Sequence, residues 1–274
     1  MDLYAQLMET KAYLQSKLAL KPRVAAVLGS GLGFVAKRLT EVTEVPYEDI
    51  PHFKVSAVPG HAGKLVVGKL GEVPVMVFCG RVHLYEGYSA VGVSYPVRAA
   101  VALGAEVVIL TNAAGTVWPH WSAGDIMIMK DHINFQGTNA LIGLDDDRLG
   151  ERFLDMTDIY DAALRGVLKS FAMARGIDLR EGVYCAFLGS SYETKAEVRM
   201  ARTLGGDALG MSTVQEAITA RQGGARVLGL SIITNLGSGV SGTPLSHGEV
   251  KEAANKVGGK FIDLLTGVIP ELLD

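Results

Sequence analysis

One short segment of the chain places three recognition-type side chains in register. Residues 80–88 read GRVHLYEGY, and Arg81, His83 and Tyr85 alternate along the segment. In an extended backbone, alternating residues point to the same side. A guanidinium and an imidazole on one face suit an oxyanion such as phosphate, and a tyrosine adds a hydroxyl and a flat ring for a sugar. A solvated edge strand is the alternative, and three such residues in register make it the weaker interpretation.

A glycine-rich turn at residues 29–33 (GSGLG) lies between an apolar run and a predicted helix. Backbone N–H groups in such a turn approach an anion closely, and Ser30 adds a hydroxyl donor. A plain strand–helix turn explains the glycines equally well. The spacing departs from the dinucleotide fingerprint, and no Gly-Lys-Ser/Thr follows, so a nucleotide-cofactor oxidoreductase is a poor alternative.

A second turn, residues 210–213 (GMST), repeats this arrangement at the start of another predicted helix. Ser212 offers a hydroxyl there, and Met211 offers a soft apolar surface. Simple capping is the alternative. Either Ser212 with Gln215 or Thr213 with Glu216 has the spacing of a capping box.

Several other polar residues have ordinary explanations when taken alone. Glu193 is expected to open a helix, where an acidic residue favours the helix dipole, and Asn235 ends an apolar strand as a turn residue would. The six histidines lack metal-ligand spacing, and the acidic run at 145–147 is typical of a hydrated loop, so no metal site is predicted. A serine hydrolase is not supported either, because no Gly-x-Ser-x-Gly elbow is present.

Composition excludes several classes of partner. The 274 residues include 26 basic and 29 acidic side chains, a net charge of −3 without a basic stripe, which argues against nucleic-acid and membrane-surface partners. Cys79 and Cys185 each lie in an apolar segment, as buried thiols do in a reducing compartment. Neither a signal peptide nor a membrane span is indicated, so a cytoplasmic protein is expected.

The elements that must position these residues alternate between strands and helices. Strands are predicted at residues 24–28, 65–70, 73–78, 107–110, 184–188 and 227–233. Helices are predicted before Pro22 and at residues 89–103, 158–175, 193–204, 213–222 and 246–268. This order predicts one α/β domain over residues 1–274, with a central mixed, mostly parallel sheet flanked by helices. Ligands bind at the carboxyl ends of strands in such sheets, where the polar loops lie.

In order and spacing, these motifs together resemble the trimeric purine nucleoside phosphorylases specific for 6-oxopurines, which are related to the methylthioadenosine phosphorylases. The matching segments are residues 28–33, 58–63, 80–88, 111–115, 124–126, 131–134, 192–194, 210–214 and 233–235. The resemblance extends from about residue 20 to the C-terminus, and it implies the fold of that family.

The resemblance also implies a role for each matching residue. Phosphate would be held by Ser30, His61, Arg81, His83, Ser212 and the backbone N–H of Ala113. Ribose would be bound by Tyr85, Met211 and His247, and the base by Tyr192, Glu193 and Asn235. Phe153 resembles the aromatic residue that a neighbouring subunit contributes, which implies a homotrimer.

The implied reaction is phosphate-dependent cleavage of inosine and guanosine, and of their 2′-deoxy forms, to the free base and (deoxy)ribose 1-phosphate. Glu193 would accept the purine N1–H, Asn235 would hydrogen-bond N7 and O6, and His83 would act beside the phosphate. Phosphate is then a co-substrate, and no metal or organic cofactor is implied. An Asp in place of Asn235 would suit a 6-aminopurine, as in the methylthioadenosine phosphorylases.

Two alternatives remain open. One is a methylthioadenosine-type phosphorylase with a 6-aminopurine preference, and the other is a non-catalytic protein that binds a nucleoside or phosphate. The chain also departs from the family at Thr116, where Gly or Ser is usual, at residues 118–121 (WPHW), and at Leu236, where some relatives have a basic residue. The 118–121 segment follows Ala113 closely, so it is expected to affect the phosphate end of the site.

Overall fold

The computed structural model of the protein describes residues 2–29, 33–56, 62–241 and 247–273, and for residues 33–34 and 247–257 it describes the backbone alone. Three predicted site residues are affected. Ser30 and His61 lie outside the described residues, and His247 is placed at the start of helix α6 without a described side chain. Ser246, the first residue of the helix predicted at 246–268, also lies outside the described residues.

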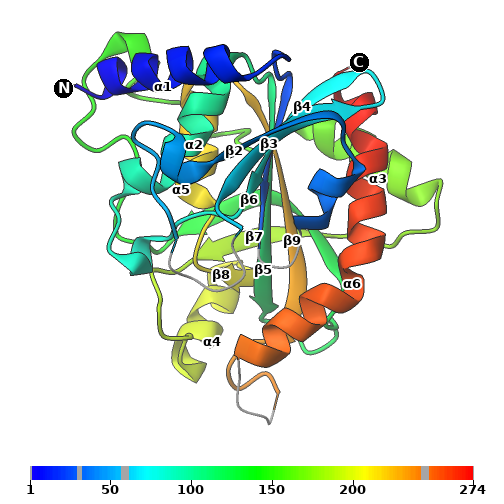
Figure 1. Cartoon of the computed structure of the whole chain (residues 1–274). Helices are drawn as coiled ribbons and strands as arrows, with labels where there is room; N and C mark the ends of the chain where they lie inside the picture. Colours follow the sequence, from blue (N-terminus) through cyan, green and yellow to red (C-terminus); the bar gives the residue numbers. More distant parts are fainter. Residues whose placement is uncertain (1, 30–32, 57–61, 242–246, 274) are drawn as a thin grey trace.

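The described residues alternate between strands and helices, as the sequence predicts (Figure 1). Their strands are β1 (Val24–Leu28), β2 (Thr40–Pro46), β3 (Lys64–Leu70), β4 (Val73–Cys79), β5 (Val107–Thr116), β6 (Ile126–Asn134), β7 (Arg180–Ala186), β8 (Ala208–Gly210) and β9 (Arg226–Leu236). Their α-helices are α1 (Leu3–Lys17), α2 (Ala90–Leu103), α3 (Ala162–Met173), α4 (Lys195–Thr203), α5 (Val214–Gln222) and α6 (His247–Val268).

The strands form one mixed sheet that closes partly on itself. Their order is β2-β3-β4-β1-β5-β8-β7-β6-β9, and β9 pairs in addition with β5. Strand β5 is parallel to β1 and β9 but antiparallel to β8, and β6 is antiparallel to β9. The additional pairing joins β5, β8, β7, β6 and β9 into a ring. The mixed α/β sheet is thus confirmed, and the ring is a feature that the sequence does not indicate.

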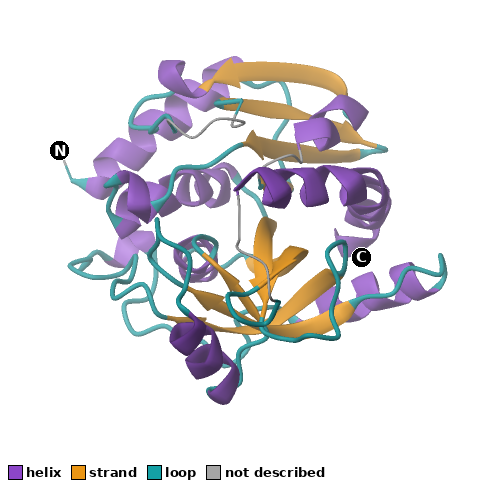
Figure 2. Ribbon diagram, turned by 90° about the horizontal axis from the view of Figure 1, so that it is seen from below, coloured by secondary structure: helices purple, strands orange, loops and turns teal. Residues whose placement is uncertain are grey.

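Helices cover both faces of the sheet, α1, α2 and α5 on one side and α3 and α6 on the other (Figures 1 and 2). The two larger apolar cores lie between the sheet and the helices, one on each face. Strand β1, buried along its whole length, contributes Ala25 and Val27 to one core and Val24, Ala26 and Leu28 to the other. Such complete burial on both faces is typical of a central strand in an α/β sheet. Among the described residues, no helix has the length and apolar character needed to cross a membrane.

Most predicted elements are present, with changes at their ends. The hairpin of β3 and β4 and helix α2 match their predicted positions, and Gly104 ends α2 with a φ of 112°, as a left-handed cap requires. Helix α3 begins four residues later than predicted, because the Asp161 side chain accepts the Leu164 N–H and caps it there. Strands β2, β6 and β8 were not predicted. Strand β2 is largely exposed, and β8 has three residues, too few to show a period.

Candidate active site

The topology brings three separate segments to the carboxyl end of β1. The β1–β5 pairing stops at Val27 and Leu110, whereas β5 continues to Thr116, so the second half of β5 borders the space beyond β1. Strand β8 is antiparallel to β5, and its Leu209 faces Gly115. The chain that leaves β8 therefore runs back along β5 towards Asn112. The segment after β4, parallel to β1, reaches the same place.

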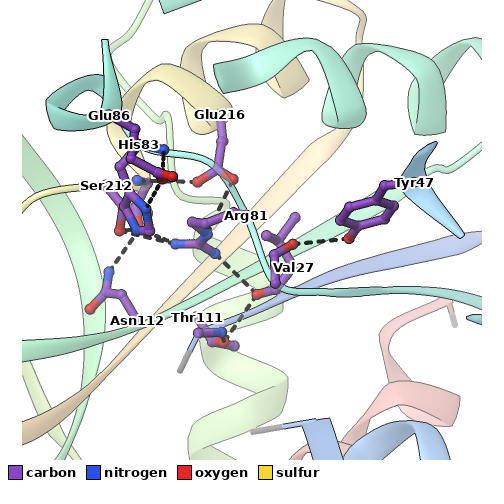
Figure 3. Close-up of polar contacts among 12 residues, drawn as sticks. Val27, Tyr47, Arg81, His83, Glu86, Thr111, Asn112, Ser212 and Glu216 are labelled. Carbon is purple, nitrogen blue, oxygen red and sulfur yellow. Dashed lines mark hydrogen bonds and ion pairs between the residues drawn. The ribbon is translucent and has the colours of Figure 1, made fainter. Parts of the chain in front are cut away.

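Arg81 lies at the centre of this convergence (Figure 3). Its side chain is 4% exposed. Its Nη1 donates to Ser212 Oγ at 3.0 Å and to Thr213 Oγ1 at 3.2 Å, and its Nη2 donates to the Val27 carbonyl oxygen at 3.2 Å. Its Nε lies 3.4 Å from the buried Glu216 carboxylate. The guanidinium is thus fixed in place by the end of β1 and by the start of helix α5, next to the Ser212 hydroxyl.

Thr213 begins helix α5 in an unusual backbone conformation. Its φ is 75°, although it is a β-branched residue. Its N–H donates to Glu216 Oε2 at 3.1 Å, so the capping box is the Thr213–Glu216 pair and not the Ser212–Gln215 alternative. Asn112 Nδ2 donates to Thr213 Oγ1 at 2.8 Å. Burial raises the pKa of the Glu216 carboxyl, and the neighbouring Arg81 charge opposes that rise.

His83 is oriented by a carboxylate three residues along the chain. Its Nδ1 lies 3.0 Å from Glu86 Oε1, and that oxygen also accepts the His83 backbone N–H at 2.8 Å. Ser56 Oγ donates to the other Glu86 oxygen at 2.9 Å. With Nδ1 bound to Glu86, the opposite edge of the imidazole carries Nε2. The His83 ring stacks on Tyr85, with centroids 4.7 Å apart and planes 12° apart.

Tyr85 and Met211 meet over Gly189. A Cβ at Gly189 would clash with Met211 Sδ and would lie 3.2 Å from Tyr85 Cδ1, so a side chain there would displace both. Burial raises the pKa of Tyr85 to about 12, and the Glu86 charge adds to the effect. Tyr85 is therefore a neutral phenol at ordinary pH, able both to donate and to accept.

Glu193 does not open helix α4, which corrects the expectation from the sequence. Thr194 is the N-cap, and its capping-box partner is Glu197. Glu193 precedes the cap and is 9% exposed. Its Oε1 has no hydrogen-bond partner among the described residues, and burial raises its pKa. Its neighbour Tyr192 is 39% exposed. A buried carboxylate oxygen without a donor is costly, so capping does not explain this residue.

A bulge aims the Asn235 side chain. The β5–β9 register passes from Ala114↔Ile233 to Gly115↔Asn235, which leaves Thr234 as an extra residue in β9. A Cβ at Gly115 would lie 2.9 Å from Asn235 Nδ2. Asn235 Oδ1 accepts from Thr234 Oγ1 at 2.9 Å, and its Nδ2 donates to the Leu236 carbonyl oxygen at 3.2 Å. Any side chain at position 115 would therefore force this amide to shift.

The structure thus brings five of the predicted residues together. Arg81, His83, Tyr85, Met211 and Ser212 form one contiguous cluster. Tyr184 lies beside this cluster. Its hydroxyl accepts the Ser212 N–H at 3.3 Å, and its pKa is raised to about 12 by burial and, to a smaller degree, by the Glu193 charge.

Two further predicted residues lie differently: Ala113 follows Asn112 in the half of β5 that borders the site, whereas Phe153 lies on the surface. Ala113 lies in β5, opposite Ile232 of β9. Phe153 is 87% exposed, and the Arg152 guanidinium lies 5.6 Å from the centroid of its ring. In a single chain, therefore, most of the Phe153 side chain is in contact with solvent.

Sequence reasoning missed the residues that hold the others in place. Glu86, Asn112 and Glu216 orient His83, Thr213 and Arg81, respectively. All three carry a local signal. Glu86 follows His83 and Glu216 follows Thr213 by three residues, as in capping boxes, and Asn112 is polar at the end of an apolar strand. None of these signals reveals which distant side chain is held.

In the unusual segment at residues 118–121, the Trp118 side chain contacts Asp207 and Arg202, not residues of the Arg81–Ser212 cluster. Trp118 Nε1 donates to Asp207 Oδ1 at 2.6 Å, and the Arg202 guanidinium lies over the Trp118 ring at 4.4 Å. Thr116 Oγ1 donates to the Asp207 carbonyl oxygen at 3.1 Å and accepts the Trp118 N–H at 3.1 Å. The threonine at this position therefore anchors the turn that follows β5.

The sequence also makes predictions about the two cysteines and about possible metal ligands. Cys79 and Cys185 are both free and buried, as predicted. Burial raises the pKa of Cys79 to about 11 and that of Cys185 to about 12, so both are unreactive thiols at neutral pH. No group of three or more His, Cys, Asp or Glu side chains within the described ranges is placed to hold a metal ion.

The amino-acid sequence is similar to a family of known proteins. The sequence profile of the phosphorylase superfamily matches residues 23–270. The chain is 48% identical to purine nucleoside phosphorylase 1 of Bacillus subtilis (strain 168), over 95% of this chain and 96% of the relative. It is 42% identical to the purine nucleoside phosphorylase of Bos taurus, over 97% and 96% of the two chains.

A solved structure agrees with these sequence matches. The crystal structure of Schistosoma mansoni purine nucleoside phosphorylase in complex with adenosine superimposes with a TM-score of 0.93. The two chains are 32% identical, and the superposition covers 98% of this chain and 97% of the other.

Proposed function

This chain belongs to the purine nucleoside phosphorylases of the phosphorylase superfamily, and from that premise we propose that it cleaves inosine and guanosine, with their 2′-deoxy forms, using inorganic phosphate. The products are the free base and (deoxy)ribose 1-phosphate. The observation that carries the proposal is the buried Arg81 guanidinium, held against Ser212 beside the oriented His83.

The phosphate half of the reaction depends on these cationic and hydroxyl groups. Cleavage of the bond between ribose and base builds positive charge on the sugar, and a phosphate dianion held against C1′ stabilises that charge and attacks the same carbon. Arg81, His83 and Ser212 bind the dianion, together with Ser30, His61 and the Ala113 N–H. Because Arg81, Ser212 and His83 are held in place by protein neighbours, catalysis is mainly positioning and electrostatic preorganisation, without a covalent enzyme intermediate.

The base half depends on Glu193 and Asn235. The leaving purine gains negative charge, which Asn235 stabilises at N7 and O6, while Glu193 accepts the N1–H that a 6-oxopurine carries. The unpartnered carboxylate oxygen of Glu193 supports this role, since an N–H donor from the base would satisfy it. Tyr192 flanks the base, and Tyr85, Met211 and His247 bind the ribose.

A preference for 6-aminopurines is the second candidate. It is favoured by the Schistosoma mansoni relative, whose crystal structure is a complex with adenosine. Adenosine lacks the N1–H that Glu193 would accept, and its amino group would face the donor side of the Asn235 amide. A site that leaves such buried polar groups unpaired discriminates strongly between the two bases. We therefore place adenosine well below inosine as a substrate.

The proposal includes a homotrimer, to which Phe153 of each subunit would contribute at a neighbour's site, and a cytoplasmic location. The exposure of the Phe153 ring supports that role, because an aromatic side chain left in water gains by packing against a partner. Phosphate is the co-substrate, and no cofactor is needed for this chemistry. Sedimentation of the purified protein measures the subunit number directly.

The experiment that tests the proposal follows hypoxanthine release from inosine, with and without phosphate, beside a parallel reaction with adenosine. We expect phosphate-dependent release from inosine and little reaction with adenosine. Release without phosphate would make the enzyme a hydrolase and would remove the assigned role of Arg81. Equal rates with adenosine would overturn the roles of Glu193 and Asn235.

A further inference from the structure

Thr213 occupies a backbone region that glycine prefers. A φ of 75° is rare for any other residue, and it is a genuine outlier for a β-branched one. Such a conformation persists only where its surroundings over-determine it. Here the Glu216 carboxylate accepts the Thr213 N–H, and the side chain is almost wholly buried at 2% exposure.

This backbone conformation places the Thr213 side-chain oxygen between Arg81 and Asn112. Thr213 Oγ1 accepts from Asn112 Nδ2 at 2.8 Å and from Arg81 Nη1 at 3.2 Å. A hydroxyl oxygen has two lone pairs and one proton. With both lone pairs engaged, the remaining proton has Ser212 Oγ, 3.2 Å away, as its acceptor.

Counting lone pairs and protons in the same way shows in which direction the Ser212 hydroxyl donates. Its Oγ accepts from Arg81 Nη1 at 3.0 Å and, by the preceding argument, from the Thr213 hydroxyl. Both of its lone pairs are then used, so the single Ser212 proton is donated to a third group. The Tyr184 hydroxyl is one acceptor within reach. A phosphate oxygen beside Arg81 is the stronger acceptor, because it carries negative charge.

We propose that Thr213 is a positioning residue for the phosphate site: its side-chain oxygen orients the Arg81 guanidinium and leaves Ser212 as a hydrogen-bond donor to phosphate. This inference rests on the proposed binding of phosphate at Arg81 and Ser212. In this arrangement, Thr213 acts through these two neighbours and not on the nucleoside.

The test compares two substitutions that differ in one oxygen. Thr213→Val keeps the branched shape without the hydroxyl, and Thr213→Ser keeps the hydroxyl. Because hydrogen bonds to a charged group are lost, we expect Thr213→Val to raise KM for phosphate about tenfold or more, with KM for inosine within about twofold of the wild-type value. Thr213→Ser should restore KM for phosphate to within about threefold of wild type.

Thr219→Val is the matched control. Thr219 is equally buried on helix α5, and its Oγ1 has no hydrogen-bond partner among the described residues. Neither KM should change in this variant. The inference is overturned if Thr213→Val leaves KM for phosphate unchanged, or if Thr213→Ser is as impaired as Thr213→Val. If the valine variant does not fold, Thr213→Ala carries the same expectation and the same contrary outcome.

Arg81→Gln separates this inference from the proposed function. If Arg81→Gln leaves KM for phosphate unchanged, phosphate does not bind at Arg81 and both proposals fail. If Arg81→Gln raises KM for phosphate but the Thr213 variants do not, the phosphate site stands and the positioning role of Thr213 is wrong.

Discussion

The two ends of the candidate site are built differently. At the proposed phosphate end, Arg81, Ser212 and Thr213 bind one another, and His83 is held by Glu86. At the proposed base end, formed by Tyr192, Glu193 and Asn235, the Asn235 amide binds only adjacent residues and Glu193 Oε1 lacks a partner among the described residues. Hydrogen bonds within the protein therefore preorganise the proposed anion site. At the other end, a bound base would supply the hydrogen-bond partner that Glu193 Oε1 lacks within the described part of the chain.

This difference has a physical reason. An orthophosphate is small, symmetrical and highly charged, so affinity for it depends on donors fixed in advance in a dry site. A purine is flat and carries different donors and acceptors on each edge. Discrimination among bases depends on buried groups that stay unpaired with the wrong edge. A base end that was already satisfied within the protein could not discriminate in this way.

The largest expected effect is loss of the cation at the phosphate end. Arg81→Gln removes the guanidinium that binds Ser212, Thr213 and Val27, and it leaves Glu216 without its cationic neighbour. We expect kcat/KM for phosphate to fall about 100-fold or more, because a buried, charge-bearing contact is lost. Initial rates at varied phosphate and saturating inosine measure this.

A matched arginine on the surface provides the control. Arg38→Gln removes an exposed pair with Asp263, and such pairs contribute about 0–1 kcal/mol to stability. If Arg38→Gln impaired phosphate use as much as Arg81→Gln, general charge and not the phosphate end would be responsible.

The next effect should appear at the base end alone. Glu193→Gln removes the carboxylate expected to accept the purine N1–H, so kcat/KM for inosine should fall about 10- to 100-fold while KM for phosphate stays near its wild-type value. Glu197→Gln is the control, since Glu197 lies only four residues along the chain, is exposed, and belongs to the capping box of helix α4. A parallel loss of phosphate affinity in Glu193→Gln would show that the two ends are not separate.

The pH dependence of inosine cleavage tests whether Glu193 must be ionised. Burial raises the pKa of this carboxyl, and only the ionised form is a full acceptor. As the pH falls through that raised pKa, the carboxylate is protonated and kcat/KM for inosine should decrease. The decrease should begin at higher pH than an exposed glutamate would give, and Glu193→Gln should lack it. An acid limb that persists in Glu193→Gln would assign the titration to another group.

Exchanging the amide at the base end should change selectivity more than rate. Asn235→Asp replaces the donor Nδ2 with a second acceptor oxygen, which suits a 6-amino group and repels a 6-oxo group. We expect the ratio of kcat/KM for adenosine to that for inosine to rise about tenfold or more, as one recognition hydrogen bond is gained and another is lost. Competition assays with both nucleosides measure the ratio. No gain for adenosine would argue against base recognition by Asn235.

The smallest effect tests how tightly the base end is packed. Gly115→Ala would place a Cβ 2.9 Å from Asn235 Nδ2, so the amide must shift. We expect kcat/KM for inosine to fall by several-fold, since such a displacement is small but lies in a recognition group. Gly166→Ala is the control, because a Cβ there meets nothing within 4 Å in helix α3. It should leave activity unchanged.

The comparison also shows what the sequence can predict. Arg81, His83 and Ser212 stand in local motifs, and strands β1 and β4 end where a run of apolar residues ends, so both the residues and their setting were predictable. Glu193 was assigned to a helix start because its position in sequence is ambiguous by one or two residues. The structure resolves the ambiguity through the Thr194 cap.

Other features depend on contacts between distant segments. The β5–β9 pairing that closes the ring has no local signal, because parallel neighbours are specified by packing across the whole domain. The bulge at Thr234 and the left-handed backbone of Thr213 are similar cases. Each is stabilised by partners far away in sequence, such as Ala114 and Asn112, so no window of the sequence reveals it.

The most direct test of the difference between the two ends is phosphate binding in the absence of any nucleoside, measured by titration calorimetry on the wild type, Arg81→Gln and Glu193→Gln. A phosphate end prepared by the protein predicts that free phosphate binds to the wild type and to Glu193→Gln with similar affinity, and that Arg81→Gln binds it at least about tenfold more weakly. Phosphate binding that requires the nucleoside, or that is weakened equally by both substitutions, would contradict the account.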